Sequence, residues 1–418
     1  MAESKKRKKK SRPERVSGIT DAKDRREVLD VYIRAFTNRS FMENHMGRSL
    51  WRGALGKMEH TRVAVADGHV VSAVTMGPRM MRFGPVAVPA MTIGPVGTHD
   101  HHRKQGYSLA AMNDATKYME ENGFLIAYLQ GIPNYYHRYG YYPYMARTSA
   151  TFGRENAKKE GLAGKLRAMT REDLPKVAKL YESVTANRIC ASVRDSELWQ
   201  WLLRYGTKTW LFRSPKVIID GRGRLCGFLT IDSKDKLDVR EVIVRRDEAS
   251  YRAALGAIVR EARRREAKEI GLTIPWDEPL GVFLRQYVGC QFKMSSNPTG
   301  DLVLKVVDFP ALMQKLEPLF TQRWKAARSG LPEVRFNLAG EIGSVGLTVG
   351  RNNVRVGPPV RGTRVHIPQR WLSGLLTGYY SVKDIAPRKK ASIPSRLLPV
   401  MEILFPAGWP WTFKADNY

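Results

Sequence analysis

The stretch best suited to chemistry is a basic loop that joins an apolar run, Met91–Thr98, to an amphipathic one. Apolar residues three or four apart predict a helix over Gly106–Asn122, with Gly123 as its C-terminal cap. The N–H groups at the start of such a helix bind a pyrophosphate, and a glycine there lets a phosphate approach the backbone closely. The sequence therefore predicts a phosphate-binding loop just before Gly106.

A second candidate is the tyrosine-rich stretch Leu129–Tyr141, which overlaps the end of a short apolar strand predicted over Phe124–Leu129. Clustered aromatic rings usually pack into a core, and we favour that interpretation for Tyr139 and Tyr141. Tyr136 lies in the same cluster.

The end of the chain is the third candidate. Chain ends are usually disordered. Four of the last ten residues here are aromatic, however, and such residues are unusual in a disordered terminus. We therefore expect the segment Phe405–Tyr418 to be packed.

Metal ligands and disulfides are not expected. Residues 99–102 read His-Asp-His-His, but adjacent residues on an extended loop point to different sides. Cys190, Cys226 and Cys290 lie far apart and form no C-x-x-C pair. This cysteine usage suits a reducing cytoplasm, which is the expected location.

The elements follow a repeated order along the chain. Helical spacing over residues 24–60 precedes strands at Arg62–Ala66, Val70–Thr75 and Met91–Thr98. From about residue 165 a similar order returns, which we interpret as an internal duplication. Its predicted elements are a helix at Leu174–Thr185, strands near Val217, at Leu225–Ile231 and at Val239–Val244, a helix at Tyr251–Lys268, and a strand at Ile270–Ile274. The last third changes character, with a strand at Leu302–Val307 and alternating runs over Val334–Val356.

The net charge of +30 points to anionic partners. Residues 1–15 supply +6 of it and are expected to form a disordered basic tail, so most of the charge lies in the folded body. Nonspecific contact with nucleic acid is one interpretation, and a merely soluble basic surface is the other. No run of about 18 apolar residues predicts a membrane span, and no secretory signal is expected.

The basic loop resembles motif A of the GNAT acetyltransferases, in which R/Q-x-x-G-x-G/A cradles the pyrophosphate of coenzyme A. Ser108 departs mildly from the small last residue of that motif. The resemblance implies acetyl-CoA as cosubstrate and no metal. It assigns cofactor binding to Val96, Gly97, Thr98, Arg103, Lys104, Gln105, Gly106, Tyr107, Ser108, Leu109, Gly131 and Ile132.

The tyrosine stretch and the chain end resemble the enhanced intracellular survival (Eis) acetyltransferases in particular. That resemblance implies Tyr136 as general acid and the carboxylate of Tyr418 as base. His137 and Arg138 would lower the tyrosine pKa if they point inward. The resemblance also implies homo-oligomers, namely hexamers built from trimers.

The fold implied is mixed α+β and α/β, with two tandem GNAT-like domains and a C-terminal α+β sterol-carrier-like domain. The GNAT-like sheets are expected to be mixed and mainly antiparallel, with flanking helices. The expected divisions are a tail at 1–15, a catalytic domain at 16–155, a degenerate copy at 156–299 and the last domain at 300–418. At the position of the phosphate loop the copy has Asp247 and Glu248 and no glycine, so we expect it to be silent.

The expected activity is direct transfer of an acetyl group to an amine, on a small molecule such as a polyamine or aminoglycoside, or on a peptide lysine. Two other classes fit the same residues. One is a regulator that binds coenzyme A without turnover. The other is a nucleic-acid-associated protein, whose binding would weaken steeply with salt.

Overall fold

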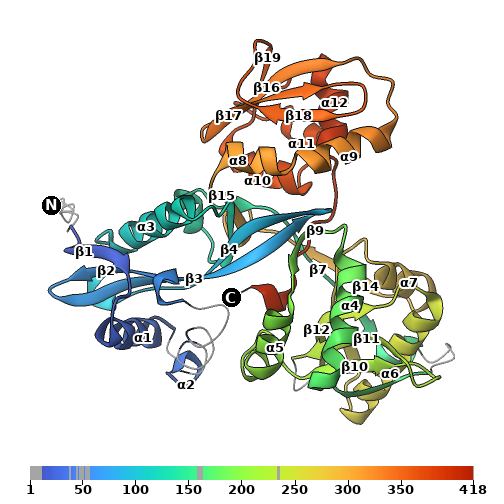
Figure 1. Cartoon of the computed structure of the whole chain (residues 1–418). Coiled ribbons are helices and arrows are strands. Elements are labelled where there is room, and N and C mark those ends of the chain that lie inside the picture. Colours follow the sequence, from blue (N-terminus) through green and yellow to red (C-terminus); the bar gives the residue numbers. More distant parts are fainter. Residues whose placement is uncertain are drawn as a thin grey trace, which may run out of the picture. The chain divides into compact units, whose positions relative to one another are not determined.

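The computed structural model describes residues 12–36, 39–43, 46, 51, 57–157, 163–232 and 236–417. The chain divides into two compact units (Figure 1). Unit 1 holds the described residues up to Pro78 together with Met91–Phe124, and unit 2 holds Arg79–Ala90 and Leu125–Asn417. Two long strands, β3 and β4, contribute residues to both units.

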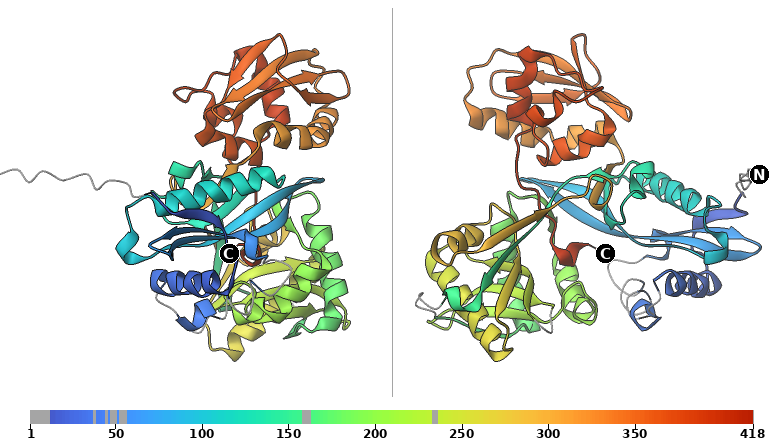
Figure 2. Two further views of the ribbon diagram at one scale, coloured as in Figure 1. Left: turned by 60° about the vertical axis from the view of Figure 1, so that its left-hand side comes forward. Right: turned by 180° about the vertical axis from the view of Figure 1, so that it is seen from behind.

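Unit 1 is a twisted antiparallel sheet with helices on its two faces. Its strand order is β1-β2-β3-β4, and Thr61 pairs with Thr75 across β2 and β3. Helices α1 and α3 lie on opposite faces of this sheet in Figure 1 and in both views of Figure 2. The elements are β1 (Arg15–Gly18), α1 (Ala22–Phe36), α2 (Arg39–Met42), η3 (Met58–His60), β2 (Thr61–Ala66), β3 (His69–Phe83), β4 (Val86–Thr98) and α3 (Tyr107–Glu121).

The helix predicted after the basic loop is confirmed. It begins after Gly106 and ends at Glu121, and Gly123 has the left-handed φ of 74° expected of a C-terminal cap. Strands β3 and β4 are longer than predicted because their apolar residues continue through Pro78 and Pro89. The strand predicted at Phe124 begins two residues later, as β5 (Ile126–Gly131).

Two strands of unit 2 pair outside the sequence segments to which we assigned them. β15 (Asp301–Val306) was expected to open the last domain, but it pairs antiparallel with β5, Leu304 opposite Tyr128, and also with β6 (Tyr142–Pro143). β7 (Arg147–Gly153), which was not predicted, falls in the segment assigned to the first domain, but it lies between β13 (Glu269–Thr273) and β14 (Gln291–Ser295). The domain boundaries proposed from sequence therefore remain predictions.

The largest sheet of unit 2 has seven strands, mostly antiparallel, in the order β14-β7-β13-β12-β11-β10-β8. A separate strand, β9 (Ile189–Val193), pairs with Met80–Phe83 of β3. The other strands are β8 (Lys165–Ala168), β10 (Pro215–Ile219), β11 (Leu225–Ile231), β12 (Leu237–Val244), β13 (Glu269–Thr273) and β14 (Gln291–Ser295). The helices of this region are α4 (Leu174–Thr185), α5 (Ser196–Arg204), α6 (Glu248–Arg264) and α7 (Pro279–Tyr287).

The predictions for α4 and β11 agree with the structure residue for residue, whereas the prediction for α6 was wrong at both ends. The helix starts three residues earlier because the Asp247 carboxylate accepts a hydrogen bond from Ser250 N at 2.8 Å and caps it. It stops at Arg264 because Glu266 turns to a φ of 57°, which ends the helical run before Lys268.

The rest of unit 2 is a four-stranded sheet with short helices, visible in orange and red in Figure 2. Its strand order is β18-β17-β16-β19. The elements are α8 (Phe309–Lys315), α9 (Glu317–Ala327), β16 (Val334–Gly340), β17 (Gly343–Val349), β18 (Val354–Gly357), β19 (Thr363–His366), α10 (Gln369–Thr377), α11 (Val382–Ile385) and α12 (Leu398–Leu404). Together the three sheets confirm the predicted mixed α+β class.

No helix in the described part of the chain is long and apolar enough to cross a membrane.

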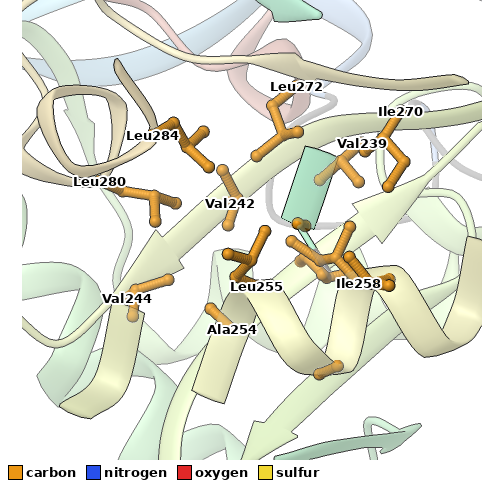
Figure 3. Close-up of a cluster of buried hydrophobic side chains, with 14 of the residues drawn as sticks. Val239, Val242, Val244, Ala254, Leu255, Ile258, Ile270, Leu272, Leu280 and Leu284 are labelled. Atoms are coloured by element: carbon orange, nitrogen blue, oxygen red, sulfur yellow. The ribbon is translucent and has the colours of Figure 1, made fainter. Parts of the chain in front are cut away.

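A core of aliphatic side chains joins α6 to the seven-stranded sheet (Figure 3). Leu255 and Ile258 of α6 point toward Val242 of β12 and Leu272 of β13, and all four are at most 5% exposed. Burial of this area drives the helix onto the sheet.

We therefore expect Leu255→Ala to lower the free energy of unfolding by about 2–5 kcal/mol, because the cavity adds to the lost burial. Urea unfolding of the full chain measures it. The control is Arg263→Ala on the exposed side of α6, for which we expect less than about 0.5 kcal/mol. A loss below about 1 kcal/mol for Leu255→Ala would contradict this assignment of the core.

Candidate active site

The predicted phosphate loop lies in unit 1 between β4 and α3. It contains one 3₁₀ turn, η4 (Asp100–His102), and Lys104 adopts a left-handed φ of 62°. The Arg103 guanidinium lies 2.6 Å from the Asp100 carboxylate, and both side chains are more than half exposed. A surface ion pair of this kind is weak, so Arg103 can exchange Asp100 for another anion at little cost.

Gly106 is the N-cap of α3 and has a φ of 101°. A glycine provides no side-chain oxygen to cap the first turn, in contrast to the serine, threonine or aspartate found at most N-caps. A Cβ built on Gly106 would meet no atom within 4 Å, so the space beside it is open. An uncapped helix start beside open space, with the positive end of the helix dipole, suits an anion such as a pyrophosphate.

The remaining cofactor candidates of unit 1 lie on β4 and on the first turn of α3. Gly97 is held close to α1, since a Cβ there would lie 3.0 Å from Tyr32 Cδ1. The Ser72 hydroxyl donates to Gly97 O at 2.9 Å and also lies 2.9 Å from the Thr98 hydroxyl. Tyr107 is buried, so only its backbone can meet a cofactor, whereas Leu109 is exposed.

The histidines of this loop lie near one another, with ring centroids of His99 and His101 5.4 Å apart and of His99 and His102 5.8 Å apart. Burial and the nearby Arg34 lower the pKa of His99. Among the described residues, no group of three His, Cys, Asp or Glu side chains is arranged to hold a metal ion.

Tyr136 lies in unit 2, at the start of the 3₁₀ turn η5 (Tyr136–Tyr139). Its ring packs edge-on against those of Tyr135 and Tyr141, at centroid distances of 5.0 and 6.2 Å. No hydrogen bond joins its hydroxyl to another described residue. Burial, followed by the neighbouring tyrosines, raises the pKa of Tyr136 well above its ordinary value.

The basic neighbours of Tyr136 do not lower its pKa, contrary to what we expected if they pointed inward. The Arg138 guanidinium instead donates to Asn134 O at 3.1 Å and lies over the Tyr135 ring. The cost of burying the ionised phenol therefore determines the direction of the shift.

Gly131 makes room for the Tyr136 ring. A Cβ at residue 131 would lie 2.3 Å from Tyr136 Cδ2, so no other residue type fits without moving the ring. The side chain of Ile132 is largely exposed, since the residue is 64% accessible to solvent. Gly131 therefore leaves the space that the Tyr136 ring occupies, a role that the sequence motif did not indicate.

A buried ion-pair network fixes the end of the described chain within unit 2. Arg194, which follows β9, forms two hydrogen bonds with Glu241 of β12 at 2.6 and 3.0 Å, and two with Asp416 at 2.9 and 3.0 Å. All three side chains are at most 1% exposed. Tyr128 of β5 donates to Asp416 O at 2.9 Å.

The predicted packing of the chain end is confirmed for residues 410–417, which are buried or half-buried, whereas residues 406–409 are exposed and Tyr418 lies outside the described residues. Arg194 and Glu241 were not predicted as site residues, because the arginine is 222 residues from Asp416 and no local spacing links them.

The start of α6, in unit 2, differs electrostatically from that of α3. Asp247 takes the N-cap position, accepts from Ser250 N and pairs with Arg245 at 2.6 Å. The side-chain carboxylate therefore occupies the place that an anion would take at an uncapped helix start; that this segment is silent stays a prediction.

Residues 19–144 match the family model described as an acetyltransferase (GNAT) domain. No curated protein matches the chain in sequence.

Solved structures share the fold over nearly the whole chain. A probable N-acyltransferase from Enterococcus faecalis V583 has a TM-score of 0.76 at 14% identity, covering 97% of this chain and 99% of its own. A GCN5-related N-acetyltransferase from Anabaena variabilis ATCC 29413 has a TM-score of 0.74 at 15% identity, covering 97% and 100%. Eis1 from Mycobacterium abscessus has a TM-score of 0.67 at 15% identity, again covering 97% and 100%. At these identities the likeness establishes the fold.

We expect Arg194→Met to lower the free energy of unfolding by about 3–5 kcal/mol, because it leaves two buried carboxylates without their cation. Urea unfolding measures the loss, and digestion with a carboxypeptidase reports whether the chain end is released. The control is Arg204→Met, at the exposed end of α5, for which we expect less than about 1 kcal/mol. If Arg194→Met unfolds like the native chain and resists the peptidase, the network does not anchor the C-terminus.

Proposed function

We propose that this chain is an N-acetyltransferase that moves an acetyl group from acetyl-CoA directly to an amine. The observation that carries the proposal is the uncapped start of α3 at Gly106, beside open space and basic side chains, within the segment that matches the acetyltransferase domain. A helix start of this kind holds the pyrophosphate of coenzyme A without a metal ion.

In the proposed reaction the neutral amine nitrogen attacks the thioester carbonyl carbon. A C–N bond forms, the C–S bond breaks, and coenzyme A leaves as a thiolate. Tyr136 donates its proton to that thiolate, and the ammonium proton passes to a base, for which we propose the Tyr418 carboxylate. Backbone groups of Val96–Thr98 would bind the pantetheine arm and the carbonyl oxygen.

The magnitudes limit what each group can do. Proton transfer from an ordinary tyrosine, with a pKa near 10, to a thiolate whose thiol has a pKa near 8.5 is uphill by about 2 kcal/mol, and burial of Tyr136 adds to this cost. A turnover of about 10 per second corresponds to an activation free energy of about 16 kcal/mol. An uphill proton transfer of this size is compatible with that barrier. An α-carboxylate, with a pKa near 3.5, is a weak base. Tyr418 would therefore act through a water molecule or by positioning the ammonium.

The acceptor is an amine on a polyamine, an aminoglycoside or a lysine side chain. The net charge of +30 disfavours polycations unless the acceptor site is locally acidic, so a panel of acceptors discriminates among the three. We further propose that the chain forms a homo-oligomer, a hexamer by its resemblance to the Eis family, which light scattering measures.

We expect Gly106→Ala to raise the KM for acetyl-CoA at least about tenfold, because a methyl group enters the space left for the phosphate. The readout is free thiol released by the full chain. The control is Gly123→Ala at the other end of α3, which also has positive φ and open space but lies away from the phosphate loop. Equal effects of the two variants would show that backbone strain alone is responsible.

Tyr136→Phe and removal of Tyr418 should each lower kcat at least about tenfold while coenzyme A still binds. Tyr141→Phe is the matched control, since its buried hydroxyl has no hydrogen-bond partner among the described residues and its loss should leave turnover unchanged. Because the pKa of Tyr136 is raised, the acid stays protonated as pH rises. We therefore expect turnover to increase with pH as the amine loses its proton, with no loss from Tyr136 below about pH 10.

Two outcomes would contradict this proposal. Binding of coenzyme A without turnover on any amine of the panel would favour a regulator, and no binding of coenzyme A would refute the proposal altogether.

A further inference from the structure

Unit 2 contains a cavity of about 330 Å³ that none of the residues assigned to acetyl transfer lines. This volume is at the lower end of the range of small-molecule sites. Its lining comes from the last turn of α4, the segment before β9, α9, the end of α10 and residues 406–409. Three arginines and one aspartate supply the charged side chains of the lining.

Arg323 of α9 is the cation that lacks a counter-ion here. One of its terminal nitrogens donates to Leu404 O at 2.6 Å, and no carboxylate of the described residues forms an ion pair with it. A guanidinium has five N–H donors, so most of them remain for a ligand in the cavity. Burial lowers the pKa of Arg323 to about 10, which shows that its charge is poorly compensated.

The other two arginines differ in how fully they are used. Arg188 is 7% exposed and is bound to Asp277 and Glu278, each at 2.9 Å, so its charge is compensated. Arg246 donates to Val184 O at 3.0 Å, is 45% exposed, and lies 4.0 Å from the same Glu278. Arg246 therefore adds a second, partly free cation, while Asp277 disfavours anions at its own edge of the cavity.

A purely structural role for these arginines is the alternative. Val184 and Leu404 lie in the last turns of α4 and α12, where arginines often bind carbonyl oxygens. A capping arginine at a surface keeps its charge in water. Arg323, in contrast, is largely buried and has no carboxylate partner among the described residues. Trp409, which is 40% exposed, also lines the cavity. Capping of a helix C-terminus by arginine does not require an exposed tryptophan.

We propose that this cavity binds a small organic anion whose phosphate or carboxylate group pairs with Arg323 and Arg246, and whose apolar body lies against Trp409. Arginine suits both head groups because its planar fork matches two acceptor oxygens. The site is independent of acetyl transfer.

The test uses phenyl phosphate and benzoate as probes on the full native chain, with binding followed by saturation-transfer NMR of the phenyl protons. Benzyl alcohol is the neutral counterpart. We expect at least one anion to bind at least about tenfold more tightly than the alcohol. Preference for phenyl phosphate would identify a phosphate head group, and preference for benzoate a carboxylate.

Arg323→Gln should weaken anion binding at least about tenfold, because glutamine keeps a donor for Leu404 O but loses the charge. Arg328→Gln, exposed just after α9, is the matched control and should leave binding within about twofold. If Arg323→Gln fails to fold, Arg246→Gln replaces it. The proposal is overturned if neither anion binds the native chain or if the variants at Arg323 and Arg246 bind like the control.

Discussion

The interaction on which the second unit most depends is the double ion pair of Arg194. It joins a residue after β9, a residue inside β12 and the last turn of the described chain, in a region without solvent. Burial alone would lower the pKa of Arg194, but the carboxylates of Asp416 and Glu241 raise it well above the ordinary value. One cation faces two carboxylates, and burial raises the pKa of Glu241. Such a network tolerates no missing member, because an unpaired buried charge costs several kcal/mol.

The second constraint on the structure is the need of the first-turn N–H groups of its helices for hydrogen-bond acceptors. Helices α6 and α3 differ in whether a side chain of the protein provides such an acceptor. At α6 the carboxylate of Asp247 does so within the protein. At α3 the N-cap is a glycine with no side chain, so an external anion can take that place. The two helix starts therefore differ in backbone and in side chain: Asp247 is extended, with φ of −146°, and carries its own carboxylate, whereas Gly106 is left-handed, with φ of 101°, and carries none.

What the sequence predicted well was local. The helix α3, its two glycines, the helix α4 and the strand β11 follow from spacing within about twenty residues. The pairing of β15 with β5 was missed because Leu304 and Tyr128 are joined only by the sheet, and no short-range pattern encodes such pairing. The raised pKa of Tyr136 was missed for a related reason, since it reflects how deeply neighbouring rings bury the hydroxyl.

Strand β5 contacts both the Tyr136 ring and the last described residues of the chain. Side chains alternate between the faces of a strand, so Tyr128 and Gln130 lie on one face and Gly131 faces the other. On the first face Tyr128 binds Asp416 O, and Gln130 accepts from Lys414 at 3.5 Å. On the second face Gly131 seats the Tyr136 ring. Within unit 2, one strand therefore seats the ring of the proposed acid on one face and holds the packed segment that ends at Asn417 on the other.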